Sequence, residues 1–180
     1  MEQNEMVALI RVGVPQAGGM WADLGAGTGN FAWALAELIG PAGQIHAIDR
    51  DARAISALHA RVRNAPALAT ILPQQADITK ALALPVLDGV VMANLLHFLR
   101  DQQAQLERIA ALLRPGGRVI TVEYEQIAPL PWIPFPLAFA RYAAMAEQAG
   151  LEQIARIGTR RSPTSGRTMY AAVAVRPLNP

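Results

Sequence analysis

A glycine-rich segment at residues 22–31 carries the strongest chemical signal in this sequence. It contains Asp23 and glycines at 25, 27 and 29, and it lies between a predicted strand and a predicted helix. Glycine lets the backbone turn tightly and approach a ligand closely. The free amides at the start of the following helix favour a carboxylate or a phosphate. The segment therefore predicts a ligand-binding loop, with a tight turn that binds nothing as the alternative.

Polar residues also stand where the next two predicted strands end. Asp49 and Arg50 follow the second strand, and Asp77 and Ile78 follow the third. Ligands of open α/β sheets bind beyond the carboxyl ends of the strands, near the point where the strand order reverses. A carboxylate at that edge can accept two hydrogen bonds from a vicinal diol. Both aspartates are therefore candidate binding residues, although each could instead cap the segment that follows it.

The fourth and fifth predicted strands end in residues that could transfer protons. Asn94 and His97 follow the fourth strand, and Glu123 and Tyr124 end the fifth. Histidine changes its charge near neutral pH, which suits a general base. His97, Glu123 and Tyr124 are therefore the candidate catalytic residues. The alternative for His97 is a purely local role at the start of a helix.

Short apolar runs alternate with helical patterns, which is typical of βαβ units around a parallel sheet. Glycine and proline end several elements, as in Gly40-Pro41 and Arg114-Pro115-Gly116-Gly117. Two final apolar runs are joined by a Gly-, Ser- and Arg-rich loop at 158–168, which predicts an antiparallel hairpin. Strands are expected at 20–25, 44–49, 68–74, 87–94, 118–124, 151–157 and 169–175, and helices at 30–39, 51–63, 101–113 and 137–148.

Length and composition limit the classes of protein to consider. The 180 residues suit one domain, 1–180. It is expected to have a short helical segment at 1–19, with a helix around residues 5–12, and an α/β core at 20–176. Cysteine is absent, which excludes disulfides and thiolate chemistry, and the net charge of +2 gives no strong nucleic-acid signal. No segment matches a signal peptide or a membrane span. We expect a cytoplasmic protein.

The spacing of the glycines separates two families of nucleotide-binding protein. The dinucleotide fingerprint Gly-x-Gly-x-x-Gly would need a third glycine at position 30, where Asn30 stands. The spacing Gly25-x-Gly27-x-Gly29 after Asp23 instead resembles motif I of class I S-adenosylmethionine-dependent methyltransferases. The resemblance continues in Ile48-Asp49-Arg50, in Gln75-Ala76-Asp77-Ile78, in the run from Asp88 to Asn94 and in Leu113-Arg114-Pro115-Gly116-Gly117.

This resemblance implies a Rossmann-like α/β fold: a seven-stranded, mostly parallel sheet with an antiparallel C-terminal hairpin and helices on both faces. It also implies S-adenosylmethionine as cofactor and S-adenosylhomocysteine as product. In this family the acid after the second strand binds the ribose, and the acid near the end of the third binds the adenine amino group. A charge inside a strand is costly, so Asp23 is expected near the ammonium group of the cofactor. The implied cofactor-binding residues are Asp23, Gly25, Ala26, Gly27, Asn30, Asp49, Arg50, Asp77, Ile78 and Asn94.

The sequence leaves the acceptor open. We expect a small organic molecule and no bound metal, because the segment Glu123-Tyr124-Glu125-Gln126 lacks the Asp-Asn pair of magnesium-dependent relatives. The proline- and aromatic-rich segment at 127–136 could wall an apolar substrate, pack as a connection, or meet a second subunit in a homodimer. Two other functions remain: a catalytically inactive subunit or sensor that binds S-adenosylmethionine or S-adenosylhomocysteine, and an NAD(P)-dependent oxidoreductase.

Overall fold

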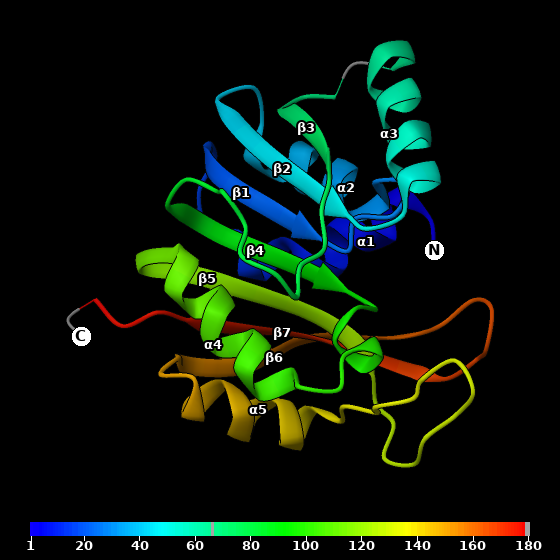
Figure 1. Ribbon diagram of the computed structural model, residues 1–180, viewed down its shortest axis with the longest axis vertical. Helices are drawn as coiled ribbons and strands as arrows, with labels where there is room; N and C mark the ends of the chain where they lie inside the picture. Colours follow the sequence, from blue (N-terminus) through cyan, green and yellow to red (C-terminus); the bar gives the residue numbers. More distant parts are fainter. Residues whose placement is uncertain (66, 179–180) are drawn as a thin grey trace.

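A seven-stranded mixed sheet with the order β3-β2-β1-β4-β5-β7-β6 forms the centre of the molecule (Figure 1). The computed structural model describes residues 1–65 and 67–178, so the last two residues of the predicted domain lie outside the described part. The first five strands are parallel, and β7 is antiparallel to both β5 and β6. The strands are β1 (Gly19–Leu24), β2 (Gly43–Asp49), β3 (Thr70–Gln75), β4 (Leu87–Ala93), β5 (Leu113–Tyr124), β6 (Glu152–Arg161) and β7 (Thr168–Val175). The predicted Rossmann-like sheet with its antiparallel hairpin is confirmed.

Helices cover both faces of this sheet, as Figure 1 shows with α4 and α5 in front of it and α1 and α2 behind it. The helices are α1 (Gln3–Ile10), α2 (Asn30–Ile39), α3 (Ala52–Asn64), α4 (Gln102–Leu112) and α5 (Phe139–Gln148). Ile10, Leu35 and Leu58 bring α1, α2 and α3 into one apolar core, and Leu106 and Tyr142 bring α4 and α5 into the other. The two cores lie on opposite sides because successive strand residues point to opposite faces.

The order of the strands places the chemistry-bearing residues at one edge. The order reverses between β1 and β4, which are hydrogen-bonded neighbours in the sheet. Because these strands are parallel, their carboxyl ends meet at the same edge, and the loops that follow β1, β2 and β4 open there. Val90, Val91 and Met92 of β4 are fully buried, so this central strand is held firmly between both layers of helices.

The start of β5 and the end of β6 differ from the predicted boundaries. The predicted turn at 114–117 is a bulge inside β5, since Gly116 donates to the Arg176 carbonyl and Arg176 to that of Gly117. Strand β6 runs on to Arg161 and so includes Arg160, which the sequence placed in a loop; Arg160 forms an ion pair with Glu5 of α1. Backbone pairing with β7 extends β5 and β6 beyond their apolar runs.

The first helix also differs slightly from expectation. It spans Gln3–Ile10 and is followed by a short 3₁₀ turn at Arg11–Gly13, whereas the sequence predicted a helix around residues 5–12. Glu2 and Glu5 form a capping box at its start, which explains the earlier beginning. In the part of the chain that the structure describes, no helix has both the length and the apolar character that crossing a membrane requires.

Candidate functional site

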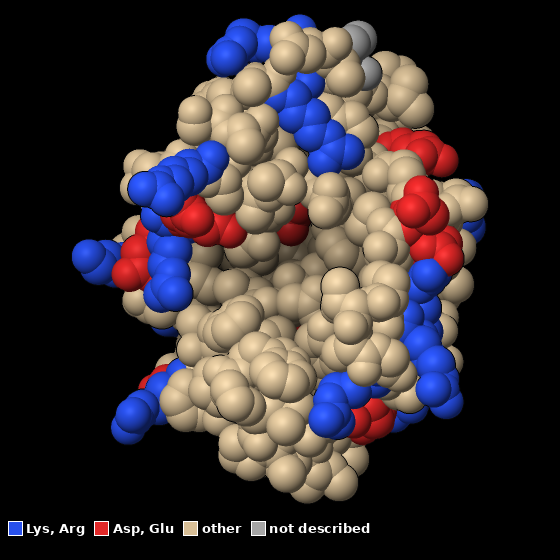
Figure 2. Space-filling view, turned by 90° about the vertical axis from the view of Figure 1, so that its right-hand side faces the viewer, with Lys and Arg blue, Asp and Glu red and all other residues tan. Residues whose placement is uncertain are grey.

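Two adjoining cavities open at the carboxyl edge of the sheet. The first, of about 220 Å³, lies between the ends of β2, β3 and β4, and the second, of about 380 Å³, lies between the ends of β1, β4 and β5. Gly25 and Asn94 line both, so the cavities meet at the switch in strand order. Figure 2 looks onto this edge and shows the hollow, with an acidic side chain deep inside it.

The glycine loop between β1 and α2 forms the wall that the two cavities share. Gly25, Gly27 and Gly29 all have positive φ angles, which side-chain-bearing residues rarely adopt. A Cβ atom on Gly25 would lie 2.7 Å from the end of the Leu95 side chain, which would have to shift, so both the space and the backbone conformation favour glycine there. A Cβ on Gly27 would meet nothing within 4 Å, because this residue faces the open cavity. The loop can therefore hold a ligand against its backbone.

The Asp49 carboxylate ties this loop to the next helix. One oxygen accepts the Gly27 N–H at 2.8 Å, and the other accepts the Asp51 N–H at 2.9 Å. Asp51 in turn caps α3 by accepting the Arg53 N–H. Each carboxylate oxygen can accept a second hydrogen bond, so Asp49 keeps capacity for a ligand hydroxyl in the first cavity, which it lines.

Asp23 is buried at the floor of the second cavity. Burial raises the pKa of its carboxyl to about 7, and the nearby Asp49 charge adds to the rise. Its Oδ2 atom has no hydrogen-bond partner within the described chain, and neither has Oδ1 of Asn94. Asn94 adopts a positive φ of 55°, an uncommon backbone conformation held by its N–H bond to the Val122 carbonyl. Two unpartnered acceptors beside one cavity favour a ligand that donates hydrogen bonds.

Asp77 and Ile78 form the far end of the first cavity. Oδ1 of Asp77 accepts hydrogen bonds from both the hydroxyl and the N–H of Thr79, which hold the pKa of this carboxyl below its usual range. Ile78 is buried, and its carbonyl accepts from the Gln105 amide. Arg50 is exposed and lines the same cavity. This end can thus accept a hydrogen bond next to an apolar surface.

All ten predicted binding residues line one cavity or the other. The first cavity is lined by residues at or after the ends of β2 and β3, namely Asp49, Arg50, Asp77 and Ile78. The second collects Asp23, Ala26, Gly27 and Asn30. Gly25 and Asn94 belong to both. The topology therefore brings together residues that are far apart in the sequence.

The three candidate catalytic residues are divided between the core and the cavity. Tyr124 lines the second cavity. His97 and Glu123 are buried and line neither cavity; His97 Nδ1 lies 2.5 Å from Glu123 Oε2. The other oxygen of Glu123 accepts the N–H groups of Leu95, Leu96 and His97, at 3.0, 2.8 and 3.4 Å. The pair therefore holds the turn after β4 in shape, while Tyr124 alone of the three faces the hollow.

One residue that supports the glycine loop, Arg61, was not predicted from the sequence. Arg61 of α3 donates to the Thr28 carbonyl at 3.3 Å and to Oδ1 of Asn30 at 3.0 Å. Its guanidinium lies 4.1 Å from the centre of the Trp33 ring. No local pattern marks Arg61, because it is one of several arginines on α3 and its partners lie about thirty residues away. It is nevertheless the side chain that braces the loop from α3.

The outer wall of the second cavity was also missed. It includes Ser162, Pro163 and Thr164 at the tip of the β6–β7 hairpin, together with Met6 of α1. The Tyr124 hydroxyl lies 3.4 Å from Ser162 Oγ, which lies 3.1 Å from Thr164 Oγ1. The sequence indicated a loop here but could not indicate that it folds back over the end of β5.

Comparison with known proteins places the chain in a family. A family model described as a methyltransferase domain matches residues 22–119, which is just over half of the chain. The ubiquinone/menaquinone biosynthesis C-methyltransferase UbiE of Pasteurella multocida is 27% identical over 106 residues, which are 58% of this chain. The matched part is 39% of that relative, so the chain spans about two fifths of its length.

Solved structures show the same fold. A SAM-dependent methyltransferase from Aquifex aeolicus matches with a TM-score of 0.72 and 16% identity over 97% of this chain and 98% of that one. Phosphoethanolamine N-methyltransferase 2 of Haemonchus contortus, solved in complex with S-adenosyl-L-methionine, matches with a TM-score of 0.78 and 16% identity. That match covers 97% of this chain and 52% of the other. At these identities the likeness establishes the fold.

Proposed function

The chain belongs to the methyltransferase domain family, whose cofactor is S-adenosylmethionine, and we propose that it transfers the cofactor's methyl group to a small organic acceptor. One observation carries this proposal. Two cavities meet at Gly25 and Asn94, and acidic side chains line both of them. Asp49 and Asp77 line the first cavity, and Asp23 lines the second. That arrangement suits a ligand with a nucleoside at one end and an amino acid at the other.

The first cavity fits the nucleoside. The free acceptor capacity of Asp49 suits the two ribose hydroxyls, because a carboxylate accepts hydrogen bonds from a vicinal diol. Asp77 offers its second oxygen, Oδ2, to the adenine amino group, since Thr79 occupies only Oδ1. The buried face of Ile78 and the side chain of Leu95 flank the space for the base. Exposed Arg50 lines the rim of this cavity.

The second cavity fits the amino-acid end. The unpartnered oxygens of Asp23 and Asn94 suit a donor with several N–H groups, such as an ammonium group. A cation there would also offset the cost of burying the Asp23 charge. The open backbone at Gly25–Gly27 and the start of α2 at Asn30 favour the carboxylate. The residues present therefore fit the cofactor that the family uses.

When bound, S-adenosylmethionine supplies an activated methyl group, so the work left to the chain is mainly alignment. Holding donor and acceptor in line lowers the activation barrier by on the order of 7–11 kcal/mol in favourable cases. The glycine loop and the turn after β4 set the position of the cofactor, and Tyr124 is the candidate residue that faces the acceptor. The Pasteurella multocida relative is a C-methyltransferase of ubiquinone and menaquinone biosynthesis, which supports a small organic acceptor here.

Calorimetric titration tests this proposal. Purified protein is titrated with S-adenosylmethionine, S-adenosylhomocysteine and NADH under the same conditions. We expect binding of the first two in the micromolar range, about −8 kcal/mol, and none of NADH. Binding of NADH alone, or of no ligand, would contradict the proposal.

The raised pKa of Asp23 predicts a pH-dependent affinity. A bound ammonium group requires the Asp23 carboxylate, so binding releases the proton that this group carries below pH 7. We expect the dissociation constant of S-adenosylhomocysteine to rise as pH falls from 7.5 to 5.5, approaching tenfold per pH unit at the acid end. Asp23→Asn should bind more weakly at pH 7.5 and lose most of this dependence. Calorimetry at four pH values measures the affinity of both proteins. An equally steep pH profile in the variant would mean that a group other than Asp23 releases the proton.

The contacts of Arg61 with the glycine loop predict a modest effect on the affinity for S-adenosylhomocysteine. Arg61→Ala removes its contacts with Thr28 and Asn30 and frees part of the glycine loop, so we expect about fivefold weaker binding of S-adenosylhomocysteine, or about 1 kcal/mol. Arg63→Ala, an exposed change on the same helix, is the matched control and should leave the affinity unchanged. Equal losses in both variants would indicate a general charge effect.

A further inference from the structure

An uncharged surface lies beside the hollow. From Gln126 to Ala140 the chain has no charged residue, and Ile127 and Trp132 are 88% and 50% exposed. Figure 1 places this loop at the lower right, beyond the end of β5, and the surface directly below the hollow in Figure 2 is largely uncharged, with charged side chains toward its sides. Large apolar side chains left in water near a binding cavity mark a surface that contacts a ligand or a partner.

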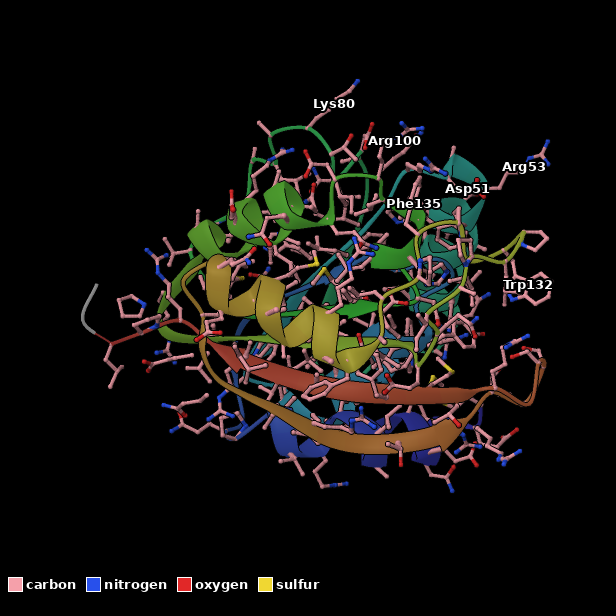
Figure 3. All side chains as sticks on the ribbon, turned by 90° about the horizontal axis from the view of Figure 1, so that it is seen from below. Asp51, Arg53, Lys80, Arg100, Trp132 and Phe135 are labelled. Carbon is pink, nitrogen blue, oxygen red and sulfur yellow. The ribbon has the colours of Figure 1, made fainter. Side chains whose placement is uncertain are left out.

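Hydrogen bonds hold this loop in place. Leu130 and Ile133 exchange two backbone hydrogen bonds, at 3.1 and 2.9 Å, around a fully buried Ile133 side chain. Phe135 donates to the His97 carbonyl at 3.0 Å, and its own carbonyl accepts from Gln102 at 2.8 Å. In Figure 3 Phe135 lies near the body of the molecule while Trp132 stands at the outer end of the loop. Trp132 is thus presented to solvent by an anchored segment.

Aromatic rings lie at the junction of the two cavities, and Phe135 joins this loop to them through its hydrogen bond to the His97 carbonyl. Phe98 is 51% exposed and lines the first cavity, and Tyr124 lines the second. Between them lies the buried His97 ring, whose centre is 4.2 Å from that of Phe98 and 5.9 Å from that of Tyr124. Phe98, Tyr124, Ile127 and Trp132 are called the acceptor face below. It begins next to Asn94, where the two cavities meet.

We propose that the acceptor is an uncharged, largely apolar small molecule with a ring, and that it binds on the acceptor face. This inference rests on the proposed function, because the sulfur joins the nucleoside to the amino acid and so belongs where the two cavities meet. A charged acceptor would lose hydration on this face without gaining a counter-charge from the four side chains that form it. Nearby Glu125 is paired with Arg156, and Arg100 lies at the border of the face, over the Phe135 ring. A ring would instead gain contact with Phe98 and Tyr124.

A second copy of the chain fits this face less well. A stable dimer buries on the order of 800 Å² on each partner. The exposed large apolar side chains here are limited to Phe98, Ile127 and Trp132 within the described chain, which are too few for the apolar centre of such an interface. A copy seated here would also cover the opening through which the acceptor must reach the methyl group.

The test uses three probes that share one ring system. 2-Naphthol is uncharged, naphthalene-2-sulfonate is an anion, and 2-naphthylmethylamine is a cation at neutral pH. Each is titrated by ligand-observed NMR into protein saturated with S-adenosylhomocysteine, whose binding is first measured by calorimetry. The double variant Ile127→Ser/Trp132→Ser removes the outer half of the acceptor face. Val86→Ser is the matched control, because Val86 is 70% exposed at the opposite end of β4.

We expect 2-naphthol to bind at least about tenfold more tightly than either charged probe. The double variant should lose roughly tenfold of that affinity, while Val86→Ser and S-adenosylhomocysteine binding stay unchanged. Equal binding of the three probes, or preference for a charged one, would overturn the inference and leave the proposed function intact. So would a dimer in sedimentation experiments that the double variant dissociates. Failure of S-adenosylhomocysteine to bind would overturn both proposals.

Discussion

Glu123→Ala is expected to lower the free energy of unfolding by about 3–5 kcal/mol, the range for losing one partner of a buried ionic network. The substitution leaves the N–H groups of Leu95, Leu96 and His97 without an acceptor and removes the partner of the His97 ring. Each buried donor left without a partner costs about 1–3 kcal/mol. Urea denaturation measures the loss.

The matched control for this prediction is Glu125→Ala, two residues further along the chain. The Glu125 side chain is partly exposed, and it pairs with Arg156 and accepts the Phe139 N–H. Its loss should cost about 1 kcal/mol or less, as is usual for exposed ion pairs. Equal losses for the two variants would mean that the Glu123 network does not hold the turn after β4. Glu123→Gln, which keeps an acceptor oxygen, should fall between the two.

Asp49→Ala is expected to weaken the binding of S-adenosylhomocysteine by roughly a hundredfold, or about 3 kcal/mol. The change removes the acceptors proposed for the ribose hydroxyls and also frees the Gly27 N–H, so it acts on the ligand and on the loop together. Calorimetry at pH 7.5 measures the affinity. Urea denaturation of the same variant checks that the protein remains folded.

Asp51→Ala is the control for this second prediction. Asp51 caps α3 through the Arg53 N–H and lines neither cavity, so its loss should cost about 1 kcal/mol of stability and leave the affinity within about twofold. A similar loss of affinity in both variants would show that Asp49 acts only by supporting the start of α3. An unchanged affinity in Asp49→Ala would contradict the proposed contact between Asp49 and the ribose hydroxyls.

The pKa of Asp23 also affects the stability of the free protein. The native carboxyl keeps its proton up to about pH 7, whereas an unfolded one releases it near pH 4. The stability that this group contributes is therefore fully present below pH 4 and is lost as pH rises through 7. A buried carboxyl such as that of Asp23 is typical of a binding site, because a bound cation offsets the cost of burying its charge.

The sheet was predictable because its parallel strands carry strong local signals. The central strand β4 is an almost continuous apolar run, and Gly40-Pro41 ends the helix before β2. The extension of β6 to Arg161 was not predictable, because it depends on backbone pairing with β7 rather than on apolar side chains. The bulge at Pro115–Gly117 likewise exists through hydrogen bonds with Arg176, about sixty residues away.

The candidate site was predictable in part for a similar reason. Parallel strands carry Asp23, Asp49 and Asn94 to one edge, so strand order alone brings these residues together. The roles of Glu123 and Tyr124 needed the structure, because neighbouring strand residues point to opposite faces and only one of the two faces the cavity. Arg61 reaches the loop by a tertiary contact that no spacing in the sequence marks.

An NMR titration shows whether one cofactor occupies both cavities at the carboxyl edge of the sheet, as we propose. Backbone amide signals of the ¹⁵N-labelled protein are followed while S-adenosylhomocysteine is added. We expect the largest shifts at Gly25, Gly27, Ile78 and Asn94, with none at Arg114 and Gly116 on the opposite edge. Shifts confined to one cavity, or largest at the opposite edge, would contradict this proposal.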